Sequence, residues 1–318
     1  MAKDKPTDAS AFSLGSDSLA LSISSAVLFL TLLGLGCSFW GGPLLWLIGQ
    51  FLVALAILHW FVILHDLGHG GFFRTKILND IAGHLASFFV ILPFYPWRYV
   101  HAGHHRWVGW KDLDPTMSQI QPRELSPLLR WLVNFCWRYW IPVFALSFSF
   151  GNFWNLSKLF RLARDRREKV KCVWSCVFLV LFVAPIFFFW PMESLRCYGL
   201  AYFLYLFVSD PLLLSQHAHI PQQHSGGEAV RPVPLRQQDI YTRTLDFPEW
   251  ISKWILLRFD RHGVHHFFPS LPLYRLGTVK LPVRNRISWI DWLRSAKSMP
   301  VHRLLLESDE SHLEARLQ

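Results

Sequence analysis

Four long apolar runs constrain the fold of this 318-residue chain more than any other feature. They cover residues 19–40, 44–64, 172–190 and 197–215, and each has about the 20 residues that an α-helix needs to cross a bilayer. Hydrophobic residues make up 52% of the chain, and their concentration in these runs favours a membrane protein over a soluble one. We therefore predict an all-α integral membrane protein with four transmembrane helices.

The rest of the chain predicts a single domain with additional helices. No polar linker interrupts residues 19–300, whereas residues 1–18 and 301–318 are polar or charged and are expected to be tails. Residues 77–96 are apolar but interrupted by polar residues and prolines, which is typical of a short or re-entrant helix at membrane depth. Residues 124–156 are aromatic and contain arginines, which favours an interfacial amphipathic helix.

The distribution of basic residues predicts the orientation in the membrane, because cytoplasmic loops collect Lys and Arg. The turn at residues 41–43 carries no charge, whereas residues 158–171 contain seven Lys or Arg. We expect the turn to lie outside and the basic segment to lie in the cytosol. Both termini are then cytosolic, and residues 220–318, which contain no further spanning run, are expected to form a cytosolic cap with short helices.

Histidines gather in four short motifs: HDLGH at 65–69, HAGHH at 101–105, QHAH at 216–219 and HGVHH at 262–266. The predicted topology places all four on the cytosolic face, although hydropathy alone assigns the spans. Imidazole suits Zn, Cu, Fe and Ni, and four ligands already complete a structural zinc site. The other three motifs supply eight histidines: His65, His69, His101, His104, His105, His262, His265 and His266. With a ninth histidine from QHAH, these are enough ligands for two metals.

Carboxylates are expected to play a secondary part. The chain contains no Glu-x-x-His pair of the kind that carboxylate di-iron bundles use, so an all-histidine site is the better interpretation. Asp66, Asp114 and Asp260 lie near the motifs and are candidates to orient the ring N–H groups or to bind metal, with a surface or capping role as the alternative. The isolated His59 is expected to be structural. The intramembrane Asp210 is expected to face a polar site.

HDLGH, HAGHH and HGVHH resemble the three histidine boxes of the membrane fatty acid desaturase superfamily. The stretch ILPFYPWRYVHAGHH resembles the approach to the second box in acyl-lipid desaturases of the Δ12/ω3 type. QHAH resembles the QHTH element of that group, and HGVHHFFPSLPLYRL resembles its third box and flank. The resemblance extends from about residue 45 to residue 277 and leaves the two tails outside.

The resemblance implies a non-haem di-iron enzyme that uses O2 and two electrons to remove two hydrogens from a fatty acyl lipid. The eight histidines of the boxes then match the metal ligands of the family. From QHAH we expect His219 to be the ninth ligand and His217 to lie beside the centre. Residues two apart do not share a helix face, so we do not expect both to bind one centre. The chain shows no haem or iron–sulfur motif, so an external donor, ferredoxin or cytochrome b5, is expected on the basic face, and no nucleic acid partner is expected.

Two alternatives remain open at this point. A lipid or carotenoid hydroxylase or ketolase shares the same histidine boxes, and product analysis separates it from a desaturase. A membrane metal-binding or transport protein without catalysis is the other alternative. Transporters usually place their ligands near the bilayer midplane on broken helices, whereas these histidines lie at helix ends on one face, which disfavours transport.

Overall fold

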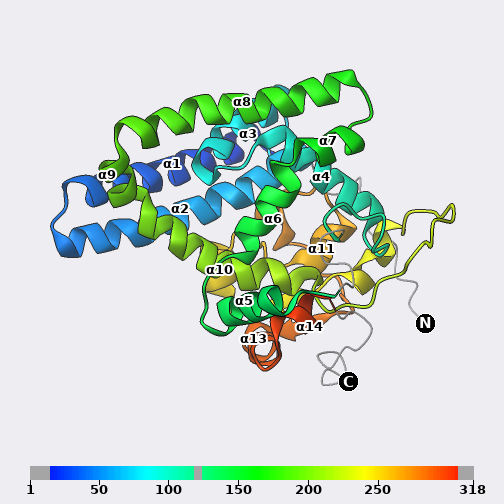
Figure 1. The fold of residues 1–318 in the computed structure, drawn as a ribbon. Helices are drawn as coiled ribbons and strands as arrows, with labels where there is room; N and C mark the ends of the chain where they lie inside the picture. The colour runs from blue at the N-terminus through cyan, green and yellow to red at the C-terminus, as the bar shows by residue number, and fades with distance from the viewer. Residues whose placement is uncertain (1–14, 118–123, 307–318) are drawn as a thin grey trace.

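The computed structural model describes residues 15–117 and 124–306. Most of the tail predicted at residues 1–18, and the last twelve residues of the tail predicted at 301–318, lie outside the described residues. In Figure 1 the long helices extend together toward one end of an elongated body, and the shorter helices and the C-terminal elements gather at the other end. The second end holds the histidines.

Among the described residues, four apolar helical segments are long enough to cross a membrane, which confirms the predicted four-span architecture of an integral membrane protein. They are α1 (Asp17–Trp40), α2 (Pro43–His69), α8 (Arg166–Phe189) and a continuous segment made of α9 (Pro191–Ser194), η3 (Leu195–Gly199) and α10 (Leu200–His217). Helix α2 extends past its predicted end and includes the HDLGH motif. It begins with a proline at its first position and ends at Gly70, whose φ of 70° lies in the left-handed region that glycine tolerates.

A sharp bend separates α3 (Lys76–Val90) from α4 (Phe94–Trp107), and the axes of the two helices differ by 101°. Ile91 has a φ of 57° and ends α3, and Pro93 cannot continue the helical hydrogen bonding. This pair occupies the region predicted as a short or re-entrant helix. The bend turns α4 across the C-terminal end of α2, which we call its inner end. The HAGHH motif on α4 therefore meets the HDLGH motif on α2.

The region predicted as one interfacial helix, residues 124–156, forms two helices, α5 (Pro127–Arg138) and α6 (Phe144–Phe153), and the short helix α7 (Leu156–Leu162) begins at its last residue. Helix α5 exposes a row of large apolar side chains, in keeping with an interfacial position. Asp210, from the fourth span, accepts hydrogen bonds from the backbone N–H groups of Phe144 and Ala145 at 3.1 and 2.6 Å. This intramembrane carboxylate therefore caps the first turn of α6 and holds α6 against α10.

The C-terminal cap contains short helices and two short strands. Strands β1 (Thr244–Asp246) and β2 (Arg286–Ser288) pair in parallel with Leu245 opposite Ile287, a pairing that the all-α prediction does not include. Residues 301–306, predicted as part of a tail, form a helix whose Val301 and Leu304 are fully buried. The helical elements of the cap are η4 (Leu235–Tyr241), η5 (Ile251–Ile255), α11 (His262–Phe267), α12 (Leu273–Leu276), α13 (Trp289–Lys297) and α14 (Val301–Leu306).

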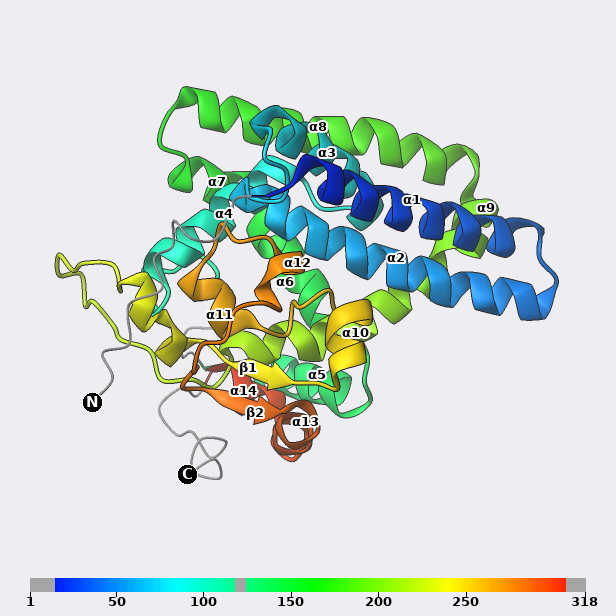
Figure 2. The same cartoon turned by 180° about the vertical axis from the view of Figure 1, so that it is seen from behind.

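The core of the molecule surrounds the inner half of α2, which is buried on all sides, whereas the outer half of α2 exposes leucines. His59 accordingly has a structural role, because its Nε2 lies 3.1 Å from the carbonyl oxygens of both Trp254 and Ile255 at the end of η5. This contact attaches the cap to the span. The view from behind in Figure 2 shows the cap elements packed along the inner part of α2.

Candidate metal centre

Nine histidines converge in two adjacent groups at the inner end of α2. Within each group, one nitrogen from every ring lies within 4.8 Å of the corresponding nitrogens of the other rings. We call the first the five-histidine group: His65, His69, His101, His105 and His265. We call the second the four-histidine group: His104, His217, His262 and His266.

Three helices supply the five-histidine group, and helical spacing explains the pairing. His65 and His69 lie one turn apart on α2, as His101 and His105 do on α4, so each pair presents two rings on one face. The Nε2 atom of His105 lies 3.1 Å from Nε2 of His101 and 3.0 Å from Nε2 of His265. Five imidazoles therefore meet without a carboxylate among them.

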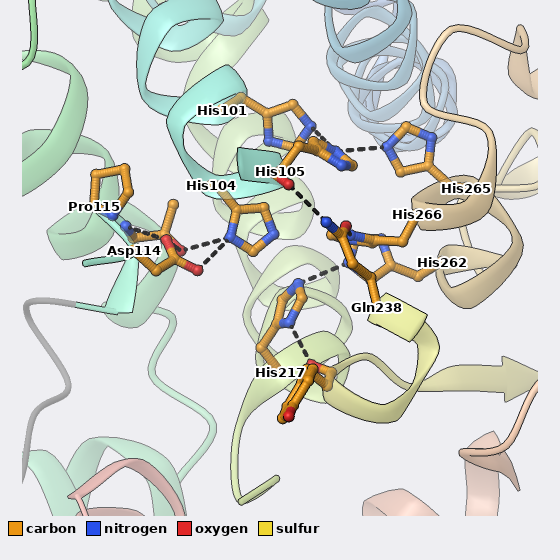
Figure 3. Close-up of polar contacts among 12 residues, drawn as sticks. His101, His104, His105, Asp114, Pro115, His217, Gln238, His262, His265 and His266 are labelled. Carbon is orange, nitrogen blue, oxygen red and sulfur yellow. Dashed lines mark hydrogen bonds and ion pairs between the residues drawn. The ribbon is translucent and has the colours of Figure 1, made fainter. Parts of the chain in front are cut away.

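The four-histidine group has a similarly tight centre, shown in Figure 3. The Nε2 atom of His262 lies 2.8 Å from Nε2 of His217 and 3.1 Å from Nε2 of His266. His217 comes from the last residue of α10, and His104 comes from α4. The second group thus joins the fourth span, α4 and the cap.

Hydrogen bonds on the outer side of the rings orient the four-histidine group. The Nδ1 atom of His104 lies 2.7 Å from Asp114 Oδ2, that of His217 lies 3.0 Å from the carbonyl oxygen of Tyr241, and that of His266 lies 3.0 Å from Gln238 Oε1. A neutral imidazole that donates through Nδ1 keeps a lone pair on Nε2. Three lone pairs therefore point at the common centre, which is the arrangement that a metal cation requires.

The five-histidine group also fits a metal, but the observation that indicates this is a different one. Among the described residues, the Nε2 atoms of His65 and His69 are buried and have no hydrogen-bond partner. Buried polar atoms without a partner are rare in proteins, because each one costs the free energy of its lost hydration. A bound cation would satisfy both atoms, so the donor set of this group also fits a metal of the kind that imidazole prefers.

Burial keeps the histidines of the cap in the neutral form that binds metal. Burial, followed by the neighbouring histidines, lowers the pKa of His262, His265 and His266 well below the ordinary value of 6.5. Burial alone would raise the pKa of Asp114, but His104 and Thr116 together hold the pKa of that carboxyl below its ordinary value. Asp114 is therefore an ionised acceptor that fixes His104 without binding at the centre.

Gln238 joins the two groups. Its side-chain oxygen accepts from His266 of the four-histidine group, and its Nε2 donates to the backbone carbonyl of His105, 2.8 Å away, in the five-histidine group. The side chain is only 1% exposed, so the amide has no competing water. The sequence alone does not predict this role, because a glutamine in a polar segment gives no signal of its partners.

An apolar cavity of about 150 Å³ lies against both groups. His65 and His101 line it from the five-histidine group, and His104, His217 and His262 line it from the four-histidine group. One face of α10 follows the cavity from Tyr202 to His217, which corresponds to roughly 22 Å along the helix. The remaining wall is mainly apolar and includes Phe61, Trp97, Phe148, Phe153, Leu213 and Phe259.

Comparisons with known proteins agree with this geometry. The model of the family described as fatty acid desaturase matches residues 39–294, which is most of the chain and contains both histidine groups. The chain belongs to the fatty acid desaturase family. This membership bears out the resemblance carried by the histidine boxes.

Relatives of this fatty acid desaturase family member are distant. A probable fatty acid desaturase of Sorghum bicolor is 29% identical over 231 residues, which cover 68% of this chain and 57% of the relative. Two acyl-lipid omega-3 desaturases of Arabidopsis thaliana are 28% and 26% identical, and each alignment covers 74% of this chain. The first is named for cytochrome b5 and the second for ferredoxin, and the alignments cover 61% and 53% of their lengths. The chain thus spans little more than half the length of these relatives.

The structure of this family member places the eight histidines of the three boxes in the two groups, but it places QHAH differently from our expectation. His217, not His219, joins the four-histidine group. Helix α10 ends at His217, Ala218 is extended, and His219 has a φ of 58°, so the chain turns away after His217. The rule that residues two apart do not share a face holds, but it does not say which of the two histidines points inward.

The three aspartates considered from the sequence have three different environments. Asp114 bonds to a ring nitrogen of the four-histidine group, as described above. Asp66 lies 3.3 Å from His65 Nδ1 and also accepts from the backbone N–H of Leu273 at 2.7 Å, which ties α12 to α2. Asp260 accepts from the Ser252 hydroxyl at 2.8 Å and belongs to neither histidine group.

Proposed function

We propose that this protein is an O2-dependent desaturase that introduces a double bond into the acyl chain of a lipid. Each histidine group holds one iron ion in this proposal, which makes the nine grouped histidines the ligands of a di-iron centre. When bound, the two irons supply the oxidising power to break unactivated C–H bonds with O2 and two electrons. The ligands are His65, His69, His101, His104, His105, His217, His262, His265 and His266.

The observation that carries the proposal is the apolar cavity against both histidine groups. A charged or hydrophilic substrate would lose its hydration in such a cavity without regaining hydrogen bonds, whereas an acyl chain loses nothing. One leaflet of the hydrocarbon core is about 15 Å deep, half of the ~30 Å bilayer core, so a cavity that follows α10 for roughly 22 Å is long enough to accompany an acyl chain through one leaflet.

The residues of the cavity perform two tasks. Phe61, Trp97 and Phe259 surround the rings of the five-histidine group with apolar surface, which excludes water from the reacting carbon atoms. Helix α6, held by Asp210, contributes the opposite wall and keeps the acyl chain in one path past the centre. Holding the chain beside the metals lowers the entropic cost of reaching the transition state.

The names of the relatives support a lipid-bound acyl substrate and a separate electron carrier. We infer that this chain likewise acts on an acyl-lipid and receives electrons from ferredoxin or cytochrome b5. The basic segment at residues 158–171 and the uncharged turn at 41–43 support an orientation with both termini and the metal centre on the cytosolic side.

Fatty-acid profiling of a host that expresses the chain tests the proposal. We expect a new unsaturated fatty acid with the wild-type protein and none with His262→Ala, which removes a proposed ligand. His224→Ala is the matched control, because His224 is an exposed histidine outside both groups, and it should retain the product. Hydroxylated fatty acid or oxygenated carotenoid as the only product would contradict desaturation, and purified protein without iron would contradict the di-iron centre.

A further inference from the structure

The short helix η4 contacts two rings of the four-histidine group. Gln238 of η4 bonds to His266, and the carbonyl oxygen of Tyr241, at the end of the same helix, bonds to His217. We propose that the outward face of η4 is the docking surface for a small acidic electron-carrier protein that reduces the metal centre. This inference rests on the proposed function and assigns the place where its electrons enter.

The residues of η4 differ sharply in exposure, and the exposed ones form its outward surface. Gln238 and Asp239 are buried, whereas Leu235 is 44% exposed and Ile240 is 36% exposed, with Arg236 and Gln237 also on the surface. The backbone of η4 joins Leu235 and Ile240, which a carrier can contact, to Gln238, whose side chain contacts His266. The hydrogen bond from His266 to Gln238 continues this path from η4 to the four-histidine group.

The surface around η4 is basic. Arg236 lies on the helix, Arg231 precedes it, and Arg106 directly follows His105, whose carbonyl oxygen contacts Gln238. Within the described residues, none of these three arginines forms an ion pair. Asp239 is buried and faces Arg284 at 4.0 Å, and the exposed Glu228 is an acidic group near Arg231 in sequence. An apolar patch within a positive rim suits an acidic protein surface.

The position of η4 favours a protein over a lipid surface as the occupant. In Figures 1 and 2 the yellow segment that contains η4 lies at the end of the molecule opposite the α1–α2 turn, away from the bundle of spans. The other strongly basic segment, residues 158–171, leads into α8 and lies where a span begins. Lipid headgroups are the natural partner of that segment, because basic residues beside a span face the anionic leaflet.

The electron balance defines what the carrier must deliver. Desaturation takes two hydrogens from the acyl chain and reduces one O2 to two waters, which requires two electrons and two protons from outside the substrate. Each docking event of a one-electron carrier oxidises that carrier once, so one double bond requires two docking events. Fast association and fast release therefore matter more than tight binding, and electrostatic steering provides them.

Charge reversal on the two basic surfaces separates this assignment from its alternative. Iron-loaded protein in nanodiscs is mixed with reduced cytochrome b5 or reduced plant-type ferredoxin, and carrier oxidation is followed by absorbance. The comparison uses whichever of the two carriers the wild-type protein oxidises faster. We expect Arg231→Glu/Arg236→Glu to oxidise that carrier at least about tenfold more slowly than wild type at low salt, and this difference should shrink as salt increases. Arg166→Glu, at the first residue of α8 within the basic segment 158–171, is the control and should keep the wild-type rate.

Reduction by dithionite keeps the test independent of folding and of the proposed function. We expect both variants to bind iron and to be reduced by dithionite at the wild-type rate, because neither substitution touches a grouped histidine. A wild-type rate in the double variant, or slowing by Arg166→Glu alone, would overturn the docking assignment while leaving desaturation in place. Wild-type protein that makes no unsaturated product with any reductant would overturn the proposed function and this inference with it.

Discussion

The two histidine groups lie side by side, but different forces orient their rings. In the four-histidine group, Asp114, Gln238 and the Tyr241 carbonyl each accept from an Nδ1 atom. In the five-histidine group the only such carboxylate contact among the described residues is the longer one between Asp66 and His65. Hydrogen bonds from the cap and the loop after α4 therefore orient one group, whereas the other relies on its helices.

Packing replaces hydrogen bonding in the five-histidine group. The Trp97 ring stacks on His101 with centroids 4.4 Å apart and meets His65 edge to face at 5.6 Å. Gly68 allows this approach, because a Cβ atom at that position would overlap the Trp97 ring. The comparison teaches that polar loops orient the rings of the four-histidine group, whereas the apolar contact between α2 and α4 orients the rings of the five-histidine group.

Loss of a ligand should produce the largest effect and should reveal the difference in ligand number. His262→Ala leaves three histidines in its group, whereas His69→Ala leaves four. We expect His262→Ala to lower the metal affinity of the four-histidine group more than about 100-fold, which exceeds the 10- to 100-fold cost of losing an orienting partner. His69→Ala should lower the metal affinity of the five-histidine group by less. Iron content after competition with a chelator measures both, with His224→Ala as control. Equal retention in the two variants would remove the distinction.

Loss of the Asp114 carboxylate should have the next largest effect. Asp114→Ala frees the His104 ring to rotate, and we expect a 10- to 100-fold loss of affinity for one metal. Asp114→Asn keeps an acceptor oxygen and should lose less. Asp66→Asn is the matched change in the five-histidine group and should change metal affinity little, because packing orients His65. An Asp66→Asn loss as large as that of Asp114→Ala would show that hydrogen bonds orient both groups.

Substitution of Gln238 should have a smaller effect that is confined to one group. Gln238→Leu removes the acceptor for His266 Nδ1, but it removes from the five-histidine group only a bond to the His105 backbone. We expect the metal affinity of the four-histidine group to fall about tenfold and that of the five-histidine group to stay unchanged. Mössbauer spectra of iron-57 protein distinguish the two irons. Gln238→Glu keeps the acceptor and should restore the signal, and equal perturbation of both irons would contradict the prediction.

Acidification should have the smallest effect near neutral pH. The pKa values of His262, His265 and His266 are lowered by burial, so below pH 6.5 the unfolded chain binds protons that the folded protein does not. Stability is therefore present above that pH and is lost as the pH falls, and we expect a lower Tm at about pH 5.5 than at about pH 7.5. The preorganised four-histidine group should keep its iron to lower pH than the five-histidine group. A Tm that rises on acidification would contradict the sign.

Local patterns in the sequence predict most of the fold and most of the centre. The spans follow from hydropathy, and eight of the nine grouped histidines follow from spacing within motifs. The choice of His217 over His219 depends on the backbone after α10, which no local pattern specifies. Gln238 contacts a carbonyl 133 residues away, and β1 meets β2 across about forty residues, so both depend on the assembled cap. Long-range partners are what the sequence leaves undetermined.

The division of α4 and α11 between the two groups has a consequence for how such a centre can evolve. On α4, His104 serves one group and its neighbours His101 and His105 serve the other, and α11 divides His265 from His262 and His266 in the same way. The backbone geometry of these helices thus sets the separation of the two histidine groups, which is a fraction of a helical turn. Side-chain substitutions can change the metal affinity of either group, but only an insertion or deletion within a helix can change the distance between the groups.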